Sequence, residues 1–277
     1  MSRIAKRFSD LAAQGRGALI PYLEAYDPDR ETSLALLRAM PAAGADLIEV
    51  GIPFSDPSAD GPVIQAAALR GLKAGATLAG VLGMVAAFRE GDAHTPVILM
   101  GYVNPVESYG YERFCKDAVA AGVDGVILVD LPPEEADVIE APAKAAGLDI
   151  IRLVAPTTTP ERLGYVLSHA SGFVYYVSIA GITGTRTASA GDLRAAIPRV
   201  RAATSLPVAV GFGVRTPEQA AQAASIADGA VVASVLIETL AGTLDAQGHA
   251  TDATLPTVLE QIGALATAVR AAGRQAA

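Results

Sequence analysis

The feature that most constrains this chain is a regular alternation of short apolar runs with longer, alanine-rich helical patterns. Eight runs have the length and composition of buried strands, at residues 17–23, 47–51, 96–101, 125–130, 148–154, 173–178, 206–211 and 229–234. Their apolar residues are nearly continuous, which is typical of parallel strands covered on both faces. Eight strand–helix units with no linker between them predict an α/β fold, a (β/α)8 TIM barrel that forms one domain over residues 1–277.

Prolines and glycines mark where several helices are expected to begin and end. The first helix after a strand should open at Asp27-Pro28 and close at Gly44, with Pro41 ending or kinking it early. An amphipathic pattern in the first 17 residues predicts an extra N-terminal helix that plugs the bottom of the barrel. Further helices are expected at 62–74, 77–90, 110–121, 133–146, 192–202 and 255–272, and after Thr159, Pro217 and the eighth strand.

The charge and composition argue against several classes of partner. The chain of 277 residues has a formal net charge of −8 and no run of lysine or arginine, which disfavours nucleic acid and anionic membranes. No apolar stretch approaches the roughly 20 residues of a membrane span, and no signal-peptide pattern opens the chain. The single cysteine, Cys115, is expected to be a small apolar helix residue. We therefore expect a cytoplasmic protein without a metal site.

Two carboxylates stand near the carboxyl ends of strands, where such barrels have their active sites. Glu49 lies inside the apolar run LIEVG, where a carboxylate is costly to bury unless it is paired or protonated. General acid–base catalysis and a structural pair with an arginine or a backbone amide both fit that position. Asp60 follows in the loop GIPFSDPSADGP (51–62), either as a second carboxylate on the rim or as the N-cap of the next helix.

Histidine and lysine are poorly placed for acid–base or Schiff-base chemistry. His94, His169 and His249 fall at expected helix ends or outer loops, and no lysine stands at a strand end. Carboxylates and tyrosines must therefore carry any proton transfer. In the sixth strand, alternation points one of Tyr175 and Tyr176 into the barrel and the other toward the helices.

Three glycine-bearing loops at one end of the barrel indicate a phosphate site. GITG (181–184), GFGV (211–214) and ASV (233–235) follow the last three strands, and the third of them opens a helix. Phosphate sites in these barrels commonly use the loops after strands seven and eight together with a helix N-terminus. The loop 179–191 is expected to be either a lid over the substrate or simply a long connection.

Five segments together resemble the alpha subunit family of tryptophan synthase: EVGIPFSDPSADGP, PVILMGYVNP, GVILVDLPPEE, YYVSIAGITG and GFGVRTPEQ. They extend over nearly the whole chain in the family's order, so the resemblance is more specific than barrel topology. It implies a carbon–carbon lyase that performs the retro-aldol cleavage of indole-3-glycerol phosphate to indole and D-glyceraldehyde 3-phosphate in L-tryptophan biosynthesis. It also implies that this chain needs no cofactor or metal.

The resemblance assigns roles to individual residues. Glu49 would protonate the indole ring at C3 as the C–C bond breaks, Asp60 would accept a hydrogen bond from the indole N–H, and Tyr175 would lie beside Glu49. The substrate-binding residues would be Tyr22, Met100, Ile127, Val129, Leu153, Thr183 and Phe212, with Thr183 bonding Asp60 when the loop closes. The phosphate-binding residues would be Gly184, Gly213, Ala233 and Ser234.

The resemblance also implies a partner, a tryptophan synthase beta subunit that carries pyridoxal phosphate, in an alpha2-beta2 heterotetramer. Contact with that partner is expected at the loops around Asp56 and Asn104.

Four residues depart from the family's usual pattern. Glu24 replaces a threonine and would put a third carboxylate near Glu49 and Asp60, on the side of the strand that Tyr22 faces. Tyr26 replaces a glycine and would crowd its loop if that position needs a positive φ. Ser58 replaces a larger apolar residue, which would weaken partner contact. Ala233 replaces a glycine, and its Cβ would hinder the approach of a phosphate.

Three alternatives stay open at this point. One is a stand-alone indole-3-glycerol-phosphate lyase that has no beta partner. Another is a catalytically impaired barrel that binds the beta subunit and regulates it, because of the departures at Glu24, Tyr26 and Ala233. A third is a different phosphate-binding barrel, such as a sugar-phosphate isomerase of histidine biosynthesis. The absence of paired aspartates at the expected strand ends disfavours the third.

Overall fold

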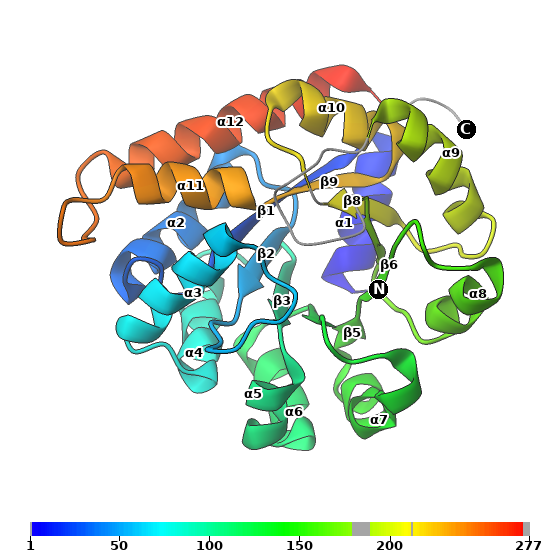
Figure 1. The fold of residues 1–277 in the computed structure, drawn as a ribbon, viewed down its shortest axis with the longest axis horizontal. Helices are drawn as coiled ribbons and strands as arrows, with labels where there is room; N and C mark the ends of the chain where they lie inside the picture. Colours follow the sequence, from blue (N-terminus) through cyan, green and yellow to red (C-terminus); the bar gives the residue numbers. More distant parts are fainter. Residues whose placement is uncertain (1, 179–188, 212, 274–277) are drawn as a thin grey trace.

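The computed structural model describes residues 2–178, 189–211 and 213–273, and these form a nearly closed barrel of parallel strands surrounded by helices (Figure 1). The strands are β1 (Ala18–Glu24), β2 (Ile48–Gly51), β3 (Val97–Gly101), β4 (Gly125–Leu128), β5 (Asp149–Ile150), β6 (Arg152–Val154), β7 (Val174–Val177), β8 (Val208–Gly211) and β9 (Gly229–Val232). Their order in the sheet is β5-β4-β3-β2-β1-β9-β8-β7-β6. The predicted TIM barrel is therefore confirmed.

The break in the barrel falls inside the fifth predicted strand, residues 148–154. There β5 pairs with β4, whereas β6 pairs with β7. Ile151 joins the two pieces, and its N–H still donates to Val126 O on the β4 side, at 3.0 Å. The run is thus divided because its hydrogen bonds change from one neighbouring strand to the other, a change that periodicity does not reveal.

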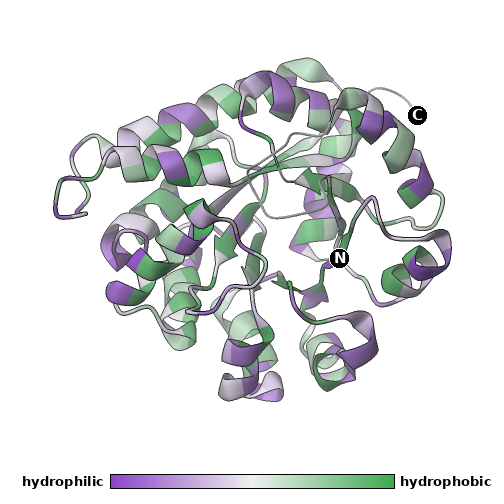
Figure 2. Ribbon diagram, viewed as in Figure 1, coloured by the Kyte–Doolittle hydropathy of each residue, from purple (hydrophilic) through white to green (hydrophobic). Residues whose placement is uncertain are grey.

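Helices cover the outside of the barrel, and Figure 2 shows their hydrophobic residues mainly on the side of the strands. They are α1 (Arg3–Ala13), α2 (Arg30–Ala43), α3 (Pro62–Lys73), α4 (Leu78–Arg89), α5 (Val103–Tyr109), α6 (Tyr111–Ala121), η1 (Pro133–Glu135), α7 (Asp137–Ala146), α8 (Pro160–Ser168), α9 (Ala190–Arg201), α10 (Pro217–Ile226), α11 (Ser234–Gly242) and α12 (Thr254–Ala272). Within the described residues, no single helix has the length and apolar composition of a membrane span; only the bent pair α3 and α4 meets that test together, by length and composition alone.

Two expectations about α2 need correction. The helix begins after Asp29, whose side chain caps it, rather than at Asp27-Pro28. It also runs through Pro41 to Ala43, so the prediction that Pro41 ends it early was wrong. Pro41 has no backbone N–H, so one hydrogen-bond donor is missing near the end of the helix. Gly44 then closes α2 in the left-handed conformation, as expected.

The N-terminal helix α1 plugs the bottom of the barrel, as predicted. Its buried face, which includes Ile4, Phe8 and Leu11, belongs to the same apolar cluster as the residues that point into the barrel. The rings of Phe8 and Phe173 lie 5.7 Å apart between centroids. The barrel interior above α1 is therefore packed with apolar side chains, and active sites in such barrels lie at the opposite end.

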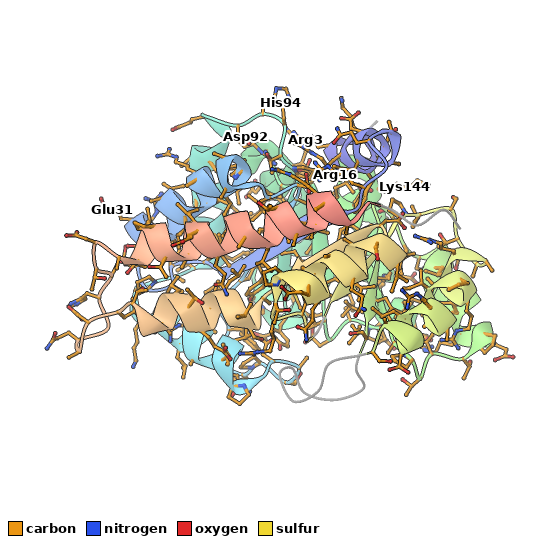
Figure 3. All side chains as sticks on the ribbon, turned by 90° about the horizontal axis from the view of Figure 1, so that it is seen from above. Arg3, Arg16, Glu31, Asp92, His94 and Lys144 are labelled. Carbon is orange, nitrogen blue, oxygen red and sulfur yellow. The ribbon has the colours of Figure 1, made fainter. Side chains whose placement is uncertain are left out.

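Asp124 ties this plug to the barrel. It is 6% exposed and accepts hydrogen bonds from Arg3 Nη1 at 2.9 Å, Arg89 Nη2 at 2.8 Å and the backbone N–H of Val97 at 2.8 Å. Arg3 also reaches the loop that carries Asp92 and His94, where its Nε donates to Ala93 O (Figure 3). One buried carboxylate thus joins α1, α4 and β3.

We expect Asp124→Asn to destabilise the protein by about 2 kcal/mol, because the amide lacks the charge that two guanidinium groups require. Unfolding in urea measures the loss. Asp10→Asn is the matched control, since Asp10 forms an exposed pair with Lys6 and should change stability by less than about 0.5 kcal/mol. Equal losses in the two variants would contradict this account of Asp124.

Candidate active site

The candidate site lies at the carboxyl ends of β1 and β2. Tyr22 of β1 is in register with Glu49 of β2, and Glu24 is in register with Gly51. Gly51 matters because a Cβ at that position would collide with the Tyr22 hydroxyl and the Glu24 carboxylate. Glycine thus lets side chains from β1 reach across the end of β2, which gathers the tyrosine and two carboxylates in one place.

Glu49 is buried in this group without a charged partner. It is 1% exposed, its Oε1 has no hydrogen-bond partner, and it forms no ion pair within the described residues. Burial raises the pKa of Glu49 to about 8, so the carboxyl is largely protonated at neutral pH. No arginine in the described part of the chain forms an ion pair with Glu49, and a carboxylic acid with a pKa near neutrality is suited to proton transfer.

The burial of Glu49 should lower the free energy of unfolding at pH values above its unfolded pKa, because the folded protein must keep the carboxyl protonated there. The folded pKa of about 8 lies above the unfolded value of 4.5, so unfolding releases a proton between these limits. The wild type should therefore lose stability relative to Glu49→Gln as pH rises through this window. We expect the variant to be more stable by on the order of 1–3 kcal/mol at about pH 8 and by much less at about pH 4. Urea unfolding at both values measures this, and a difference independent of pH would contradict it.

Tyr22 and Tyr175 lie close enough to Glu49 for its charge to affect their pKa values. Tyr175 belongs to the cluster inside the barrel, whereas its neighbour Tyr176 belongs to the outer core, as strand alternation predicted. A Cβ at Gly211 would collide with the Tyr175 hydroxyl, so glycine again makes room at a strand end. Burial raises the pKa of Tyr22 and of Tyr175, and the negative charge of Glu49 adds to the rise in both.

Asp60 is half-buried on the rim above this group. Burial raises its pKa, and a hydrogen bond with Tyr102 opposes that rise. The N-cap of α3 is Gly61, with no side-chain cap, so the alternative that Asp60 caps this helix was wrong. A small cavity of about 10 Å³ brings Asp60 together with Tyr22 and Glu24.

The walls expected for the substrate lie around the same space. Met100 and Val129 line that cavity. Ile127 is buried inside the barrel, and Leu153 packs against the same interior cluster. Thr183, Gly184 and Phe212 lie outside the described residues. The five described wall residues, Tyr22 included, thus come together at the upper end of the barrel interior.

Of the three loops predicted for phosphate, the one after β9 leads directly into a helix N-terminus. Ser234 is the first residue of α11, and Ala233 precedes it without a side-chain cap. Gly213 adopts a positive φ of 84° after β8. The Ala233 methyl packs against the small apolar cluster that contains Tyr22 and Ile237, and its backbone, at φ −122° and ψ −80°, lies outside the helical and extended regions. The unbonded N–H groups of a helix start are suited to an anion.

Tyr26, another departure from the family pattern, does adopt the positive φ that a glycine would favour, 65°. Its backbone N–H donates to Ser33 Oγ at 3.1 Å, and its ring packs in the outer core. The side chain therefore lies away from the carboxylates, and the backbone conformation is its only cost.

Tyr102 is a residue that the sequence reasoning missed. It follows β3 directly, its hydroxyl accepts from Ala59 N–H at 3.1 Å, and it bonds Asp60. Its position just after a strand end was the signal that could have identified it. The histidines, in contrast, lie where they were expected: His94 and His249 are exposed, and His169 bonds Glu140 on the outside.

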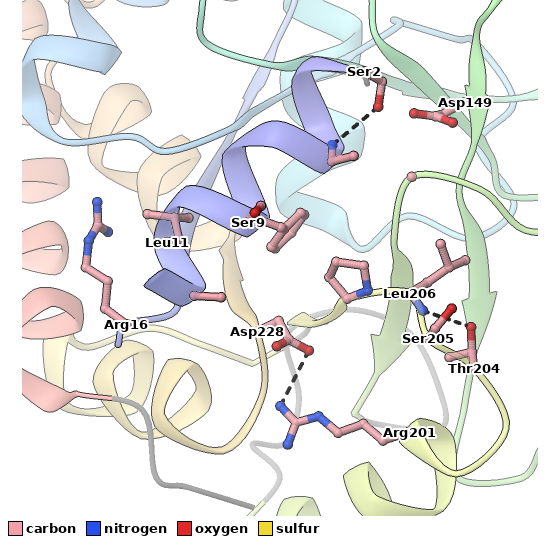
Figure 4. Close-up of a pocket in the computed structure, with 15 residues that line it drawn as sticks. Ser2, Ser9, Leu11, Arg16, Asp149, Arg201, Thr204, Ser205, Leu206 and Asp228 are labelled. Carbon is pink, nitrogen blue, oxygen red and sulfur yellow. Dashed lines mark hydrogen bonds and ion pairs between the residues drawn. The ribbon is translucent and has the colours of Figure 1, made fainter. Parts of the chain in front are cut away.

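A larger cavity, of about 610 Å³, lies at the opposite end of the barrel beside α1 (Figure 4). Its arginines are already paired: Arg201 faces Asp228 at 3.4 Å, and Arg16 donates two hydrogen bonds to Asp46. The buried carboxylates and tyrosines described above, rather than the size of a cavity, therefore locate the candidate site.

Comparisons with known proteins identify the family of the chain. The sequence profile of the family "Tryptophan synthase alpha chain" matches residues 8–267. The chain is 71% identical over 270 residues to the tryptophan synthase alpha chain of Gluconacetobacter diazotrophicus, covering 98% of each chain. It is 68% identical over 271 residues to that of Gluconobacter oxydans, covering 98% of this chain and all of the relative.

Solved structures give the same result. The crystal structure of tryptophan synthase subunit alpha from Legionella pneumophila superposes with a TM-score of 0.89 at 42% identity, covering 97% of this chain and 98% of that one. A structure of Mycobacterium tuberculosis tryptophan synthase gives 0.87 at 39% identity, covering 98% and 99%. The chain therefore belongs to the tryptophan synthase alpha chain family.

Proposed function

We propose that this protein is a carbon–carbon lyase that catalyses the alpha reaction of tryptophan synthase in L-tryptophan biosynthesis. In that reaction indole-3-glycerol phosphate is cleaved to indole and D-glyceraldehyde 3-phosphate. The observation that carries the proposal is the buried Glu49, with an unpartnered Oε1 and a pKa of about 8, at the carboxyl end of a barrel strand. Family membership supports the choice of reaction.

In the proposed mechanism, Glu49 transfers its proton to C3 of the indole ring. The positive charge that develops on the ring is stabilised by Asp60, which accepts a hydrogen bond from the indole N–H. The C–C bond then breaks as the side-chain hydroxyl gives its proton to the Glu49 carboxylate, leaving an aldehyde and neutral indole. One proton moves from oxygen to carbon in total, so Glu49 ends protonated and no co-reactant is consumed.

The remaining assignments concern binding. We propose that the start of α11, at Ala233 and Ser234, holds the phosphate together with Gly213 and Gly184. Tyr22, Met100, Ile127, Val129, Leu153 and Phe212 would surround the indole ring, Tyr175 would lie beside Glu49, and Thr183 would bond Asp60 in the closed site.

The proposed partner is a tryptophan synthase beta subunit, which would supply pyridoxal phosphate chemistry that this chain does not perform. The name of the family supports a beta partner, and an alpha2-beta2 heterotetramer is our proposal for the assembly. Asp56, Ser58 and Asn104 are exposed at the expected contact loops. The cytoplasm is the proposed location.

Indole release from indole-3-glycerol phosphate, measured with and without added beta subunit, tests the function and separates its alternatives. We expect release by the isolated chain and a faster rate with the partner. A rate that the partner leaves unchanged would favour a stand-alone lyase. Activation of the beta subunit without any cleavage would favour the impaired regulator. The absence of both cleavage and activation would contradict the proposal.

A further inference from the structure

Glu24 is a buried carboxylate that the proposed mechanism does not use. It ends β1, is 3% exposed and accepts a short hydrogen bond from the Tyr22 hydroxyl. Both side chains lie over Gly51, in the space that a Cβ would otherwise occupy. Glu24 also lines the small cavity that contains Asp60, so its carboxyl forms part of the wall of the proposed indole site.

The charges around Glu24 leave it without a cation of its own. Among the described residues, the cation that acts on its charge is Arg70, whose guanidinium already donates two hydrogen bonds to Asp27, at 2.6 and 2.8 Å. Asp60 and Asp27 add negative charge, and Tyr22 supplies the hydrogen bond. Burial is the largest effect and raises the pKa of Glu24 to about 8, although the Tyr22 hydrogen bond and the Arg70 charge oppose the rise.

We propose that Glu24 is a positioning residue for the indole ring: in its neutral form, bonded to Tyr22, it makes the wall of the ring site, and in its ionised form it weakens binding of the ring. This inference rests on the proposed function, which supplies indole as a product. The physical reason is that an apolar ring covering an ionised carboxylate removes water from it without replacing the lost hydrogen bonds. Asp60 is more exposed, and its hydrogen bond with Tyr102 opposes the rise of its pKa, so this carboxyl retains more of its tendency to ionise.

Binding of indole itself tests this inference, because indole stays neutral over the pH range and needs no turnover. All proteins compared carry Glu49→Gln, which removes the other carboxyl whose pKa is about 8. With Glu24 present, the dissociation constant should rise about ten-fold from about pH 7 to about pH 9, as the neutral fraction falls to about one tenth. With Glu24→Gln it should stay nearly constant, and the exposed control Glu31→Gln should behave like the parent.

Tyr22→Phe distinguishes this role of Glu24 from a merely structural one, which would not change the pH dependence of binding. The Tyr22 hydroxyl lowers the pKa of Glu24 by donating to the carboxylate. Its removal should therefore move the midpoint of the rise in the indole dissociation constant to higher pH.

Infrared difference spectra between the parent and Glu24→Gln should show the C=O stretch of a protonated carboxylic acid at neutral pH.

A parent affinity that does not change with pH, an equal pH dependence in Glu24→Gln, or a missing carboxylic acid band would each overturn the inference about Glu24. The proposed function is judged separately, by cleavage of indole-3-glycerol phosphate in the protein that retains Glu49. A wild type that cleaves the substrate while Glu24→Gln keeps the pH dependence would therefore refute the role of Glu24 alone.

Discussion

Glu49→Gln is expected to lower kcat for indole release by about a hundred- to ten-thousand-fold, the usual contribution of a general acid–base residue. Glutamine keeps the shape of the side chain but has no proton to transfer to C3 of the ring. The effect should fall on kcat more than on KM, because Glu49 acts on the reacting carbon rather than on the phosphate. Steady-state kinetics of indole formation measure both constants.

Stability and activity should separate in this variant, which guards against a trivial loss through unfolding. Glu49→Gln should remain folded and be more stable than the wild type at about pH 8, for the linkage reason given above. Glu90→Gln, at the exposed end of α4, is the control and should keep wild-type kcat. Wild-type kcat in Glu49→Gln would remove this residue from the proposed mechanism.

Asp60→Asn should lower kcat by about a hundred- to a thousand-fold, comparable to the loss of one preorganised charge-stabilising group. The amide fills the same space and still bonds Tyr102, but it lacks the charge that opposes the positive indole ring. Burial raises the pKa of the half-buried Asp60, and its hydrogen bond with Tyr102 opposes that rise and favours the charged form.

Kinetics of indole formation by Asp60→Asn, beside Asp56→Asn, measure this effect. Asp56 lies in the same loop but is exposed, and it should leave cleavage by the isolated chain unchanged. If the two variants lose activity equally, then the loop as a whole, and not the charge of Asp60, would be responsible.

Much of the fold followed from local patterns, because parallel strands buried on both faces leave continuous apolar runs in the sequence. Pro62, Thr159 and Pro217 stand at helix starts as expected, and Gly44 closes α2. The helix α5 and the divided strand at Ile151 were not predicted. The division follows from a change of strand partner, and the first N–H of α5, at Val103, donates to Asp130; a periodicity reports neither contact. The single domain over residues 1–277 stays a prediction.

The site was predicted less completely from the residues themselves. The position of Glu49 in an apolar strand singled the residue out, because burial of an unpaired carboxylate is costly, but it left catalysis and a structural pair both open. Asp60 was ambiguous until the cap of α3 was seen to be Gly61. The pairing of Glu24 with Tyr22 depends on the space over Gly51, and the contact of Tyr102 with Asp60 depends on the approach of two loops. The functional roles of the site residues stay predictions.

The central claim is that this chain breaks the C–C bond of indole-3-glycerol phosphate by proton transfer through Glu49. Purified wild-type protein should be incubated with the substrate, and indole and glyceraldehyde 3-phosphate should be quantified in the same sample. The account predicts equal molar amounts of the two products from the wild type and almost none from Glu49→Gln over the same time. No indole from the wild type, or equal yields from the two proteins, would contradict it.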